Sequence, residues 1–128
     1  MAESIEHPSG PPALPDEAIV VRGGVMASED LVVNAETHND EFPEEWAISV
    51  ACAPGLTAGA MVRQSGWIRN NAVRLSTVGQ VRAIGHDVIP SGKFPHADLK
   101  LCEEPSDALW EELRSVFSAP IKKSELPS

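Results

Sequence analysis

The sequence has 128 residues and a formal net charge of −9, and this length accommodates one domain. The acidic balance argues against a general coat for nucleic acid, because phosphate binding needs clustered Lys and Arg. The longest nearly apolar run, residues 46–56, is too short to span a bilayer, and the first residues lack the pattern of a secretory signal. We therefore expect a cytoplasmic protein that does not insert into a membrane.

Both ends of the chain are poor in large apolar side chains. Residues 1–15 contain several prolines, and residues 119–128 are polar with two further prolines. Such segments bury too little surface to offset the loss of chain entropy. We predict a disordered Pro-rich tail over residues 1–15, a single α+β domain over residues 16–118 and a flexible C-terminal tail over residues 119–128.

The first half of the chain shows a strand, a helix and a second strand. A β-branched run ends at two glycines, a serine then precedes two acidic residues as a helix cap does, and an acidic loop leads to an alternating apolar pattern. The predicted elements are a strand over residues 17–22, a helix from Ser28 to about residue 40, a loop over residues 40–45 and a strand over residues 46–51.

The second half adds three helices and a hairpin. Hydroxyl side chains at Thr57, Ser76, Thr77 and Ser106 are positioned to cap helices. Strands and helices alternate, which favours an α+β fold with a mixed or antiparallel sheet. The predicted elements are helices over residues 58–64, 78–84 and 106–118, a strand over residues 73–75, and a hairpin of residues 86–89 and 96–101.

The cysteines and histidines do not show the spacing of a metal site. Cys52 and Cys102 lie far apart in the sequence, and neither His38, His86 nor His96 has a second histidine or a cysteine pair nearby. We predict no metal ion, and we expect two buried free thiols that behave as small hydrophobes.

The charges are distributed unevenly along the chain. Residues 1–45 are strongly acidic and contain Arg22 as their only Lys or Arg, whereas residues 46–102 have more basic than acidic side chains. One interpretation is that these segments fold against each other or keep the surface soluble. The other is that the central segment presents a basic face to phosphate or RNA, while the acidic third binds a basic protein.

Three side chains are candidates for catalysis. Arg22 ends an apolar strand before Gly23 and Gly24, His38 lies on the apolar side of its predicted helix, and His96 enters a strand directly after a Pro-containing loop. In one hypothesis they share a cleft, where the two imidazoles move protons and Arg22 stabilises an anionic centre. In the other, Arg22 is a salt-bridged strand end and the histidines are ordinary polar residues.

A second group suits the binding of an anion. Ser76 and Thr77 precede a predicted helix, whose free N–H groups and dipole attract phosphate. Arg74 and Arg82 lie close by in the sequence and add positive charge. We predict that these four residues bind the substrate, although a cap without any ligand remains the alternative.

The order of some motifs resembles known families. Arg22 in Val21-Arg22-Gly23, then Ser76-Thr77, then Glu103-Glu104 follow the order of the Arg, Ser-Thr-Ser and Glu motifs of the ADP-ribosyltransferase fold, a resemblance that implies NAD as cosubstrate; otherwise no cofactor is expected. The segment from residue 56 to the hairpin also resembles a winged-helix DNA-binding domain.

Most of residues 19–118 is similar to short actinobacterial proteins associated with toxin–antitoxin gene pairs. The similar motifs are Val-Val-Arg-Gly-Gly-Val-Met, Ala-Pro-Gly-Leu-Thr and Gly-Lys-Phe-Pro-His. This resemblance implies a toxin-like enzyme that cleaves or ADP-ribosylates RNA or a nucleotide, uses Arg22, His38 and His96, and has an antitoxin as protein partner. The alternative from the residues themselves is a non-catalytic binding module that uses its acidic N-terminal region. The sequence leaves the oligomeric state open.

Overall fold

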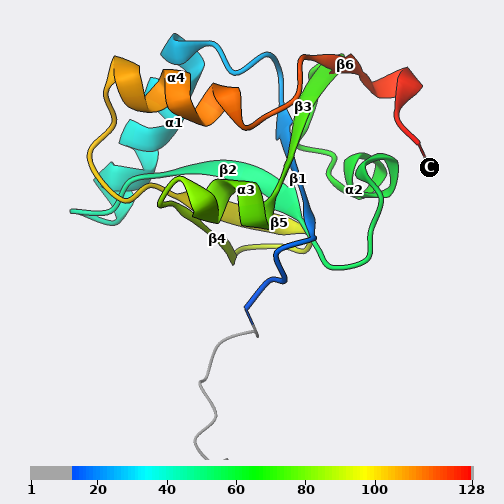
Figure 1. Cartoon of the computed structure of the whole chain (residues 1–128), viewed down its shortest axis with the longest axis horizontal. Helices are drawn as coiled ribbons and strands as arrows, with labels where there is room; N and C mark the ends of the chain where they lie inside the picture. Colours follow the sequence, from blue (N-terminus) through cyan, green and yellow to red (C-terminus); the bar gives the residue numbers. More distant parts are fainter. Residues whose placement is uncertain (1–12, 128) are drawn as a thin grey trace, which may run out of the picture.

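A six-stranded antiparallel sheet organises the chain, and the computed structural model describes residues 13–127 of it (Figure 1). The spatial order of the strands is β4-β5-β2-β1-β3-β6, and every neighbouring pair is antiparallel. This single sheet with its helices confirms the predicted α+β class. The strands are β1 (Ile19–Gly23), β2 (Ala47–Cys52), β3 (Ala72–Thr77), β4 (Asp87–Pro90), β5 (His96–Lys100) and β6 (Ile121–Lys122).

Helices cover both faces of the sheet. Because side chains alternate along a strand, Val20 and Val50 point to the face packed against α1, α3 and α4, whereas Val21 and Ala51 point to the face packed against α2. Figure 1 shows α1 and α4 side by side over the first face and α2 apart from them. The helices are α1 (Ser28–Glu41), α2 (Ala58–Gln64), α3 (Val78–Ala83) and α4 (Asp107–Ser115), followed by a 3₁₀ turn, η2 (Lys123–Glu125).

Of the five hydroxyl side chains expected to cap helices, three do so, whereas Ser28 and Ser76 do not. The side chains of Thr57, Thr77 and Ser106 each accept a hydrogen bond from the backbone N–H three residues further on. Ser28 is instead the first residue of α1, and Ala27 precedes it without a side-chain cap. The Ser28 hydroxyl accepts a hydrogen bond from Arg114 at 3.1 Å. This oxygen therefore binds a side chain of α4 and does not cap the first turn of α1.

Both predicted tails need correction where the structure describes them. Leu14 has only 4% of its surface exposed and belongs to the main core, so the predicted N-terminal tail contributes a packing side chain. Residues 1–12 lie outside the described residues. At the other end, Ile121 of β6 is paired with Val73 of β3, and η2 follows. The C-terminal segment is therefore part of the sheet.

The two cysteines differ from each other in exposure. Both are free thiols, but only Cys52 is buried, and Cys102 is exposed, contrary to expectation. Burial raises the pKa of the Cys52 thiol to about 11, partly offset by the positive charge of Arg82. Among residues 13–127 no helix combines the length and the apolar character needed to cross a bilayer.

Candidate functional site

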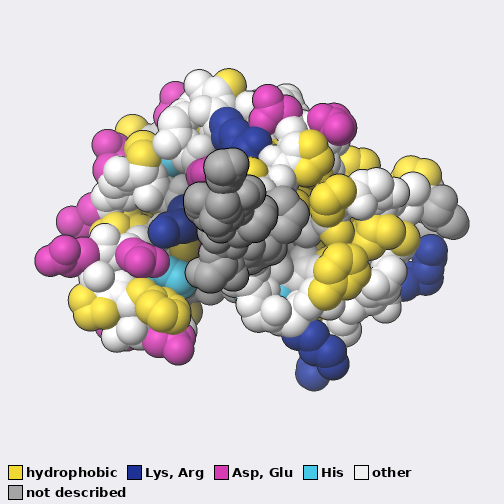
Figure 2. Space-filling model, turned by 90° about the horizontal axis from the view of Figure 1, so that it is seen from below, with side chains coloured by type: hydrophobic (Ala, Val, Ile, Leu, Met, Phe, Trp, Pro, Cys, Tyr) yellow, Lys and Arg dark blue, Asp and Glu magenta, His cyan; other side chains and the backbone are white. Residues whose placement is uncertain are grey.

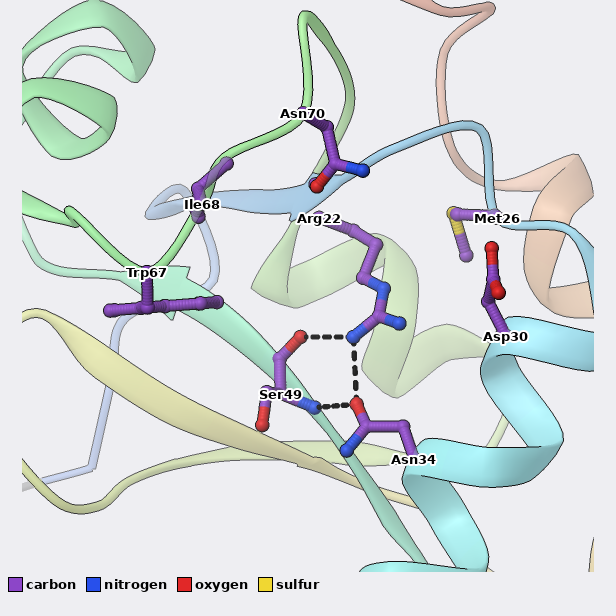
Figure 3. A pocket seen from close by; sticks show the side chains of 9 residues that line it. Arg22, Met26, Asp30, Asn34, Ser49, Trp67, Ile68 and Asn70 are labelled. Atoms are coloured by element: carbon purple, nitrogen blue, oxygen red, sulfur yellow. Dashed lines mark hydrogen bonds between the residues drawn. The ribbon is translucent and has the colours of Figure 1, made fainter.

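The hydrogen-bonded ladder between β1 and β2 is interrupted beside Arg22. The two strands pair at Val20–Cys52 and Val21–Ala51, and the pairing goes no further. Beyond that point, the peptide of Ser49 bonds to side chains: its N–H donates to Asn34 Oδ1 at 2.8 Å, and its carbonyl accepts from Arg22 Nη1 at 2.7 Å. Nη1 also donates to Asn34 Oδ1 at 2.8 Å (Figure 3). Arg22 and Asn34 thus replace the missing β1 backbone.

Only one edge of the Arg22 guanidinium takes part in these contacts. Nη1 makes both hydrogen bonds, whereas Nε is buried without a partner and Nη2 bonds to none of the described residues. Burial lowers the pKa of Arg22, and the nearby charge of Asp30 raises it by less. Arginine nevertheless stays protonated in proteins. The side chain therefore offers a desolvated positive charge in which Nε is enclosed by protein and Nη2 has no hydrogen-bond partner among the described residues.

A pocket of about 360 Å³ lies beside Arg22. Its walls come from the end of β1, from α1, from β2 and from the loop between α2 and β3 (Figure 3). Trp67 of that loop is 42% exposed, although Ile68 beside it is buried. The lining residues are Arg22, Gly23, Met26, Asp30, Asn34, Ser49, Trp67, Ile68 and Asn70.

The two glycines after Arg22 let the loop approach closely. A Cβ atom placed on Gly23 would lie 2.7 Å from Asn70 Oδ1, closer than real side chains allow. Gly24 has φ +84° and would bring a Cβ within 3.2 Å of Asn70 Nδ2; this backbone region favours glycine. The group that approaches these glycines is the side-chain amide of Asn70.

His96 lies next to this pocket but on the other face of the sheet. His96 pairs with Ala51 of β2 and therefore points to the face that α2 covers. Arg22 is two residues after Val20 on β1 and therefore points to the opposite face. Nδ1 of His96 is 3.0 Å from Ser91 Oγ, and the ring meets Trp67 edge-on with 5.2 Å between centroids. His96 lines a separate, mainly apolar pocket of about 530 Å³. Trp67 is thus the link between His96 and the Arg22 pocket.

His38 lies in neither pocket. Its Nε2 is 3.4 Å from Glu45 Oε1, and its ring centroid is 5.0 Å from that of Phe42. The side chain is 13% exposed, so the prediction of an inward-facing histidine agrees with its burial. The described structure does not place Arg22, His38 and His96 around one cleft, because they belong to different pockets and faces.

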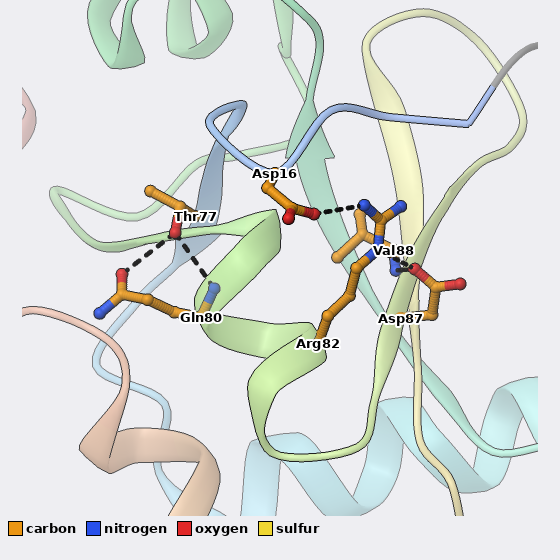
Figure 4. Close-up of polar contacts among 6 residues, drawn as sticks. All are labelled: Asp16, Thr77, Gln80, Arg82, Asp87 and Val88. Atoms are coloured by element: carbon orange, nitrogen blue, oxygen red, sulfur yellow. Dashed lines mark hydrogen bonds and ion pairs between the residues drawn. The ribbon is translucent and has the colours of Figure 1, made fainter.

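Arg82 is engaged in ion pairs rather than open to a ligand. Its Nε donates to Asp87 Oδ1 at 2.9 Å and its Nη1 to Asp16 Oδ1 at 2.7 Å (Figure 4). Burial alone would raise the pKa of Asp87, but hydrogen bonds from Arg82 and from the Val88 N–H lower it. The same figure shows Thr77 capping α3 through the N–H of Gln80. These groups connect α3 to its neighbours.

Arg74 and Ser76 connect β3 to the segment after α4. Arg74 donates from Nε to the Ser118 carbonyl at 2.7 Å and from Nη1 to the Val25 carbonyl at 3.0 Å. Ser76 Oγ donates to the Val116 carbonyl at 2.7 Å. The four residues predicted to bind substrate therefore make protein contacts and point to different partners, and the structure does not bring them together as one anion site.

Of the residues that line the Arg22 pocket, the sequence singled out only Arg22 and Gly23, and it missed the polar and aromatic side chains of Asp30, Asn34, Trp67 and Asn70. In the sequence, Asp30 is an ordinary acidic residue of a first helical turn, and Trp67 and Asn70 belong to no recognisable motif. The one usable signal was the isolated Arg22 before two glycines. In the part of the chain that the structure describes, no group of three or more His, Cys, Asp or Glu side chains is placed to hold a metal ion.

His86 is a buried histidine outside both pockets. Its Nδ1 accepts the Cys102 N–H at 3.1 Å, and its buried Nε2 has no partner. Burial lowers the pKa of His86 from its ordinary 6.5, an effect that Glu112 and Glu103 partly oppose.

The pH dependence of stability tests this environment. With a depressed folded pKa, the unfolded chain binds the proton first, so stability is full above pH 6.5 and is lost as the pH falls through the folded pKa. We expect the midpoint of urea unfolding to drop between about pH 7 and about pH 5. His86→Asn keeps an acceptor for Cys102 N–H without a titrating ring, and its midpoint should drop less. Equal slopes would contradict the assignment.

Comparisons with known proteins identify no relative: no family model, no curated protein and no solved structure matches this chain. The site itself defines a class in chemical terms, namely a small α+β protein with a pocket built on a desolvated arginine.

Proposed function

We propose that this protein binds a small ligand through a carboxylate or phosphate group at Arg22. The observation that carries the proposal is a buried guanidinium that lines a pocket of ligand size and whose Nη2 has no protein partner among the described residues. A guanidinium N–H donates a charge-assisted hydrogen bond to an oxygen of a carboxylate or phosphate.

The contacts around Arg22 prepare it for this role. Nη1 is held by Asn34 and Ser49, so the plane of the guanidinium is set before a ligand arrives. A fixed donor loses little freedom on binding, and a low-dielectric surrounding strengthens its attraction to an anion. Trp67 supplies an exposed aromatic wall on which a base or another ring can stack. A nucleotide is therefore one ligand of suitable chemistry.

Replacing Arg22 tests the proposal directly. Lysine keeps the charge but lacks the planar fork, so Arg22→Lys should weaken binding of any carboxylate or phosphate ligand by about tenfold or more. Isothermal titration calorimetry with nucleoside monophosphates and small carboxylic acids measures this. Arg69→Lys is the matched control, because Arg69 is exposed on the loop that carries Trp67 but does not line the pocket.

Two controls make the result decisive. Circular dichroism and thermal melting establish that Arg22→Lys is folded at the assay temperature. If none of the anions binds the wild-type protein, or if Arg22→Lys binds as tightly, Arg22 is only a structural replacement for the β1 backbone and the proposed function is wrong.

A catalytic role toward RNA or a nucleotide is a second candidate, favoured by the edge contact between Trp67 and His96. A phosphate at Arg22 and a base on Trp67 would bring His96 near the substrate as general acid or base. The test follows cleavage of a labelled oligoribonucleotide and release of nicotinamide from NAD. His96→Gln should abolish whichever activity exists, whereas His38→Gln, outside the pockets, should retain it.

The acidic surface supports the third possibility, a module that binds a basic protein such as an antitoxin. Figure 2 shows Asp and Glu side chains gathered on the side where α1 and the following loop lie. Val33 and Phe42 are exposed on the same segment, and exposed apolar groups among charges are typical of protein interfaces. The triple change Glu41→Gln, Glu44→Gln, Glu45→Gln should then abolish salt-sensitive binding of an oligolysine peptide.

A further inference from the structure

Asp30 contributes a negative charge to the pocket that holds Arg22. Both residues line it, and the charge of Asp30 raises the pKa of Arg22, which places the two groups within electrostatic reach. In the described structure they form no ion pair, because no Arg22–Asp30 contact lies within 4.0 Å. Figure 3 shows Asp30 on the side of the guanidinium away from Trp67. A ligand at Nη2 of Arg22 therefore lies in a pocket that also holds a carboxylate.

This arrangement discriminates between anions. A dianionic phosphate gains from Arg22 but is repelled by Asp30, and like charges in a partly desolvated site are costly. A ligand that carries an ammonium group next to its carboxylate satisfies both residues. Its carboxylate accepts from Nη2 of Arg22, and its ammonium donates hydrogen bonds to Asp30.

The other walls indicate what else such a ligand carries. Trp67 adds exposed aromatic surface, whereas Met26 and Ile68 are buried, and Trp67 lies across the guanidinium from Asp30 (Figure 3). A substituent that extends from Asp30 past the guanidinium therefore meets the ring of Trp67. The volume of about 360 Å³ is within the usual range for small-molecule pockets.

We infer that the Arg22 pocket takes a zwitterion of the α-amino acid type with an apolar or aromatic side chain. The inference rests on the proposed function and makes it specific: Arg22 binds the carboxylate, Asp30 binds the ammonium and Trp67 contacts the side chain. At this site a ligand of the amino-acid type should therefore bind more tightly than a nucleotide.

Three matched probes test the inference by isothermal titration calorimetry on the full chain: L-phenylalanine, 3-phenylpropanoate without the ammonium group, and adenosine monophosphate. Wild-type protein should bind L-phenylalanine about tenfold or more tightly than 3-phenylpropanoate. Asp30→Asn should remove that preference while 3-phenylpropanoate binds at least as tightly as before. Asp40→Asn, an exposed change later on α1, is the control and should leave the preference unchanged.

The outcomes separate this inference from the proposed function. If 3-phenylpropanoate or adenosine monophosphate binds in an Arg22-dependent way and L-phenylalanine binds no better, the zwitterion is wrong and anion binding stands. If Asp30→Asn keeps the preference for L-phenylalanine, Asp30 does not bind the ammonium and the inference is also overturned. If Arg22→Lys affects none of the probes, both fall.

Discussion

Replacing Leu113 with alanine should lower the free energy of unfolding by about 2–5 kcal/mol. Leu113 is fully buried in α4 and belongs to the main core cluster with Trp110 and Phe117. The truncation removes apolar contact and leaves a cavity that the helix and sheet can fill only in part. Urea denaturation followed by tryptophan fluorescence measures the loss.

Glu111→Ala is the matched control for this prediction, because Glu111 is exposed on the same helix. It should change the free energy of unfolding by no more than about 0.5 kcal/mol, as surface substitutions usually do. A loss of that small size for Leu113→Ala would show that α4 does not pack on the sheet as described.

Replacing Asn34 with alanine should destabilise the interrupted β1–β2 ladder. The amide oxygen of Asn34 accepts from both the Ser49 N–H and Arg22 Nη1. Its removal leaves the Ser49 N–H without an acceptor, at a cost of about 1–3 kcal/mol, and takes from Arg22 Nη1 one of its two acceptors. The unfolding free energy and the hydrogen-exchange rate of the Ser49 amide report the effect.

Asn34→Asp separates the lost hydrogen bonds from a change in packing. Aspartate has nearly the same shape and retains an oxygen that accepts from both donors, so most of the stability and the slow exchange of Ser49 should return. If alanine and aspartate behave alike, the side chain of Asn34 does not hold β2 at this position.

The helices and most strands could be predicted because their signals are local. Thr57, Thr77 and Ser106 precede apolar periodic segments, and their hydroxyls cap the helices as expected. The hairpin was also anticipated: β4 and β5 pair, with Val88 opposite Leu99. Each of these features depends on residues a few positions apart.

The features that escaped prediction depend on distant partners. Arg22 bonds to Asn34, 12 positions away, and to Ser49, 27 positions away. β6 has two residues and no strand pattern of its own, and it forms because β3 offers it an edge. Leu14 is a single apolar side chain in a Pro-rich segment, and its burial depends on a core built from other elements.

The sequence by itself therefore determined the α+β class, the order of the elements, the caps of three helices and the unusual position of Arg22 before two glycines. Tertiary structure decided which charges are free. It paired Arg82 with Asp16 and Asp87, tied Arg74 to the Ser118 carbonyl, and left Nη2 of Arg22 without a partner among the described residues, in the pocket that Asp30 also lines. The physical reason is that the partners within reach of a buried charged side chain are set by how the strands and helices pack, and not by its neighbours along the chain.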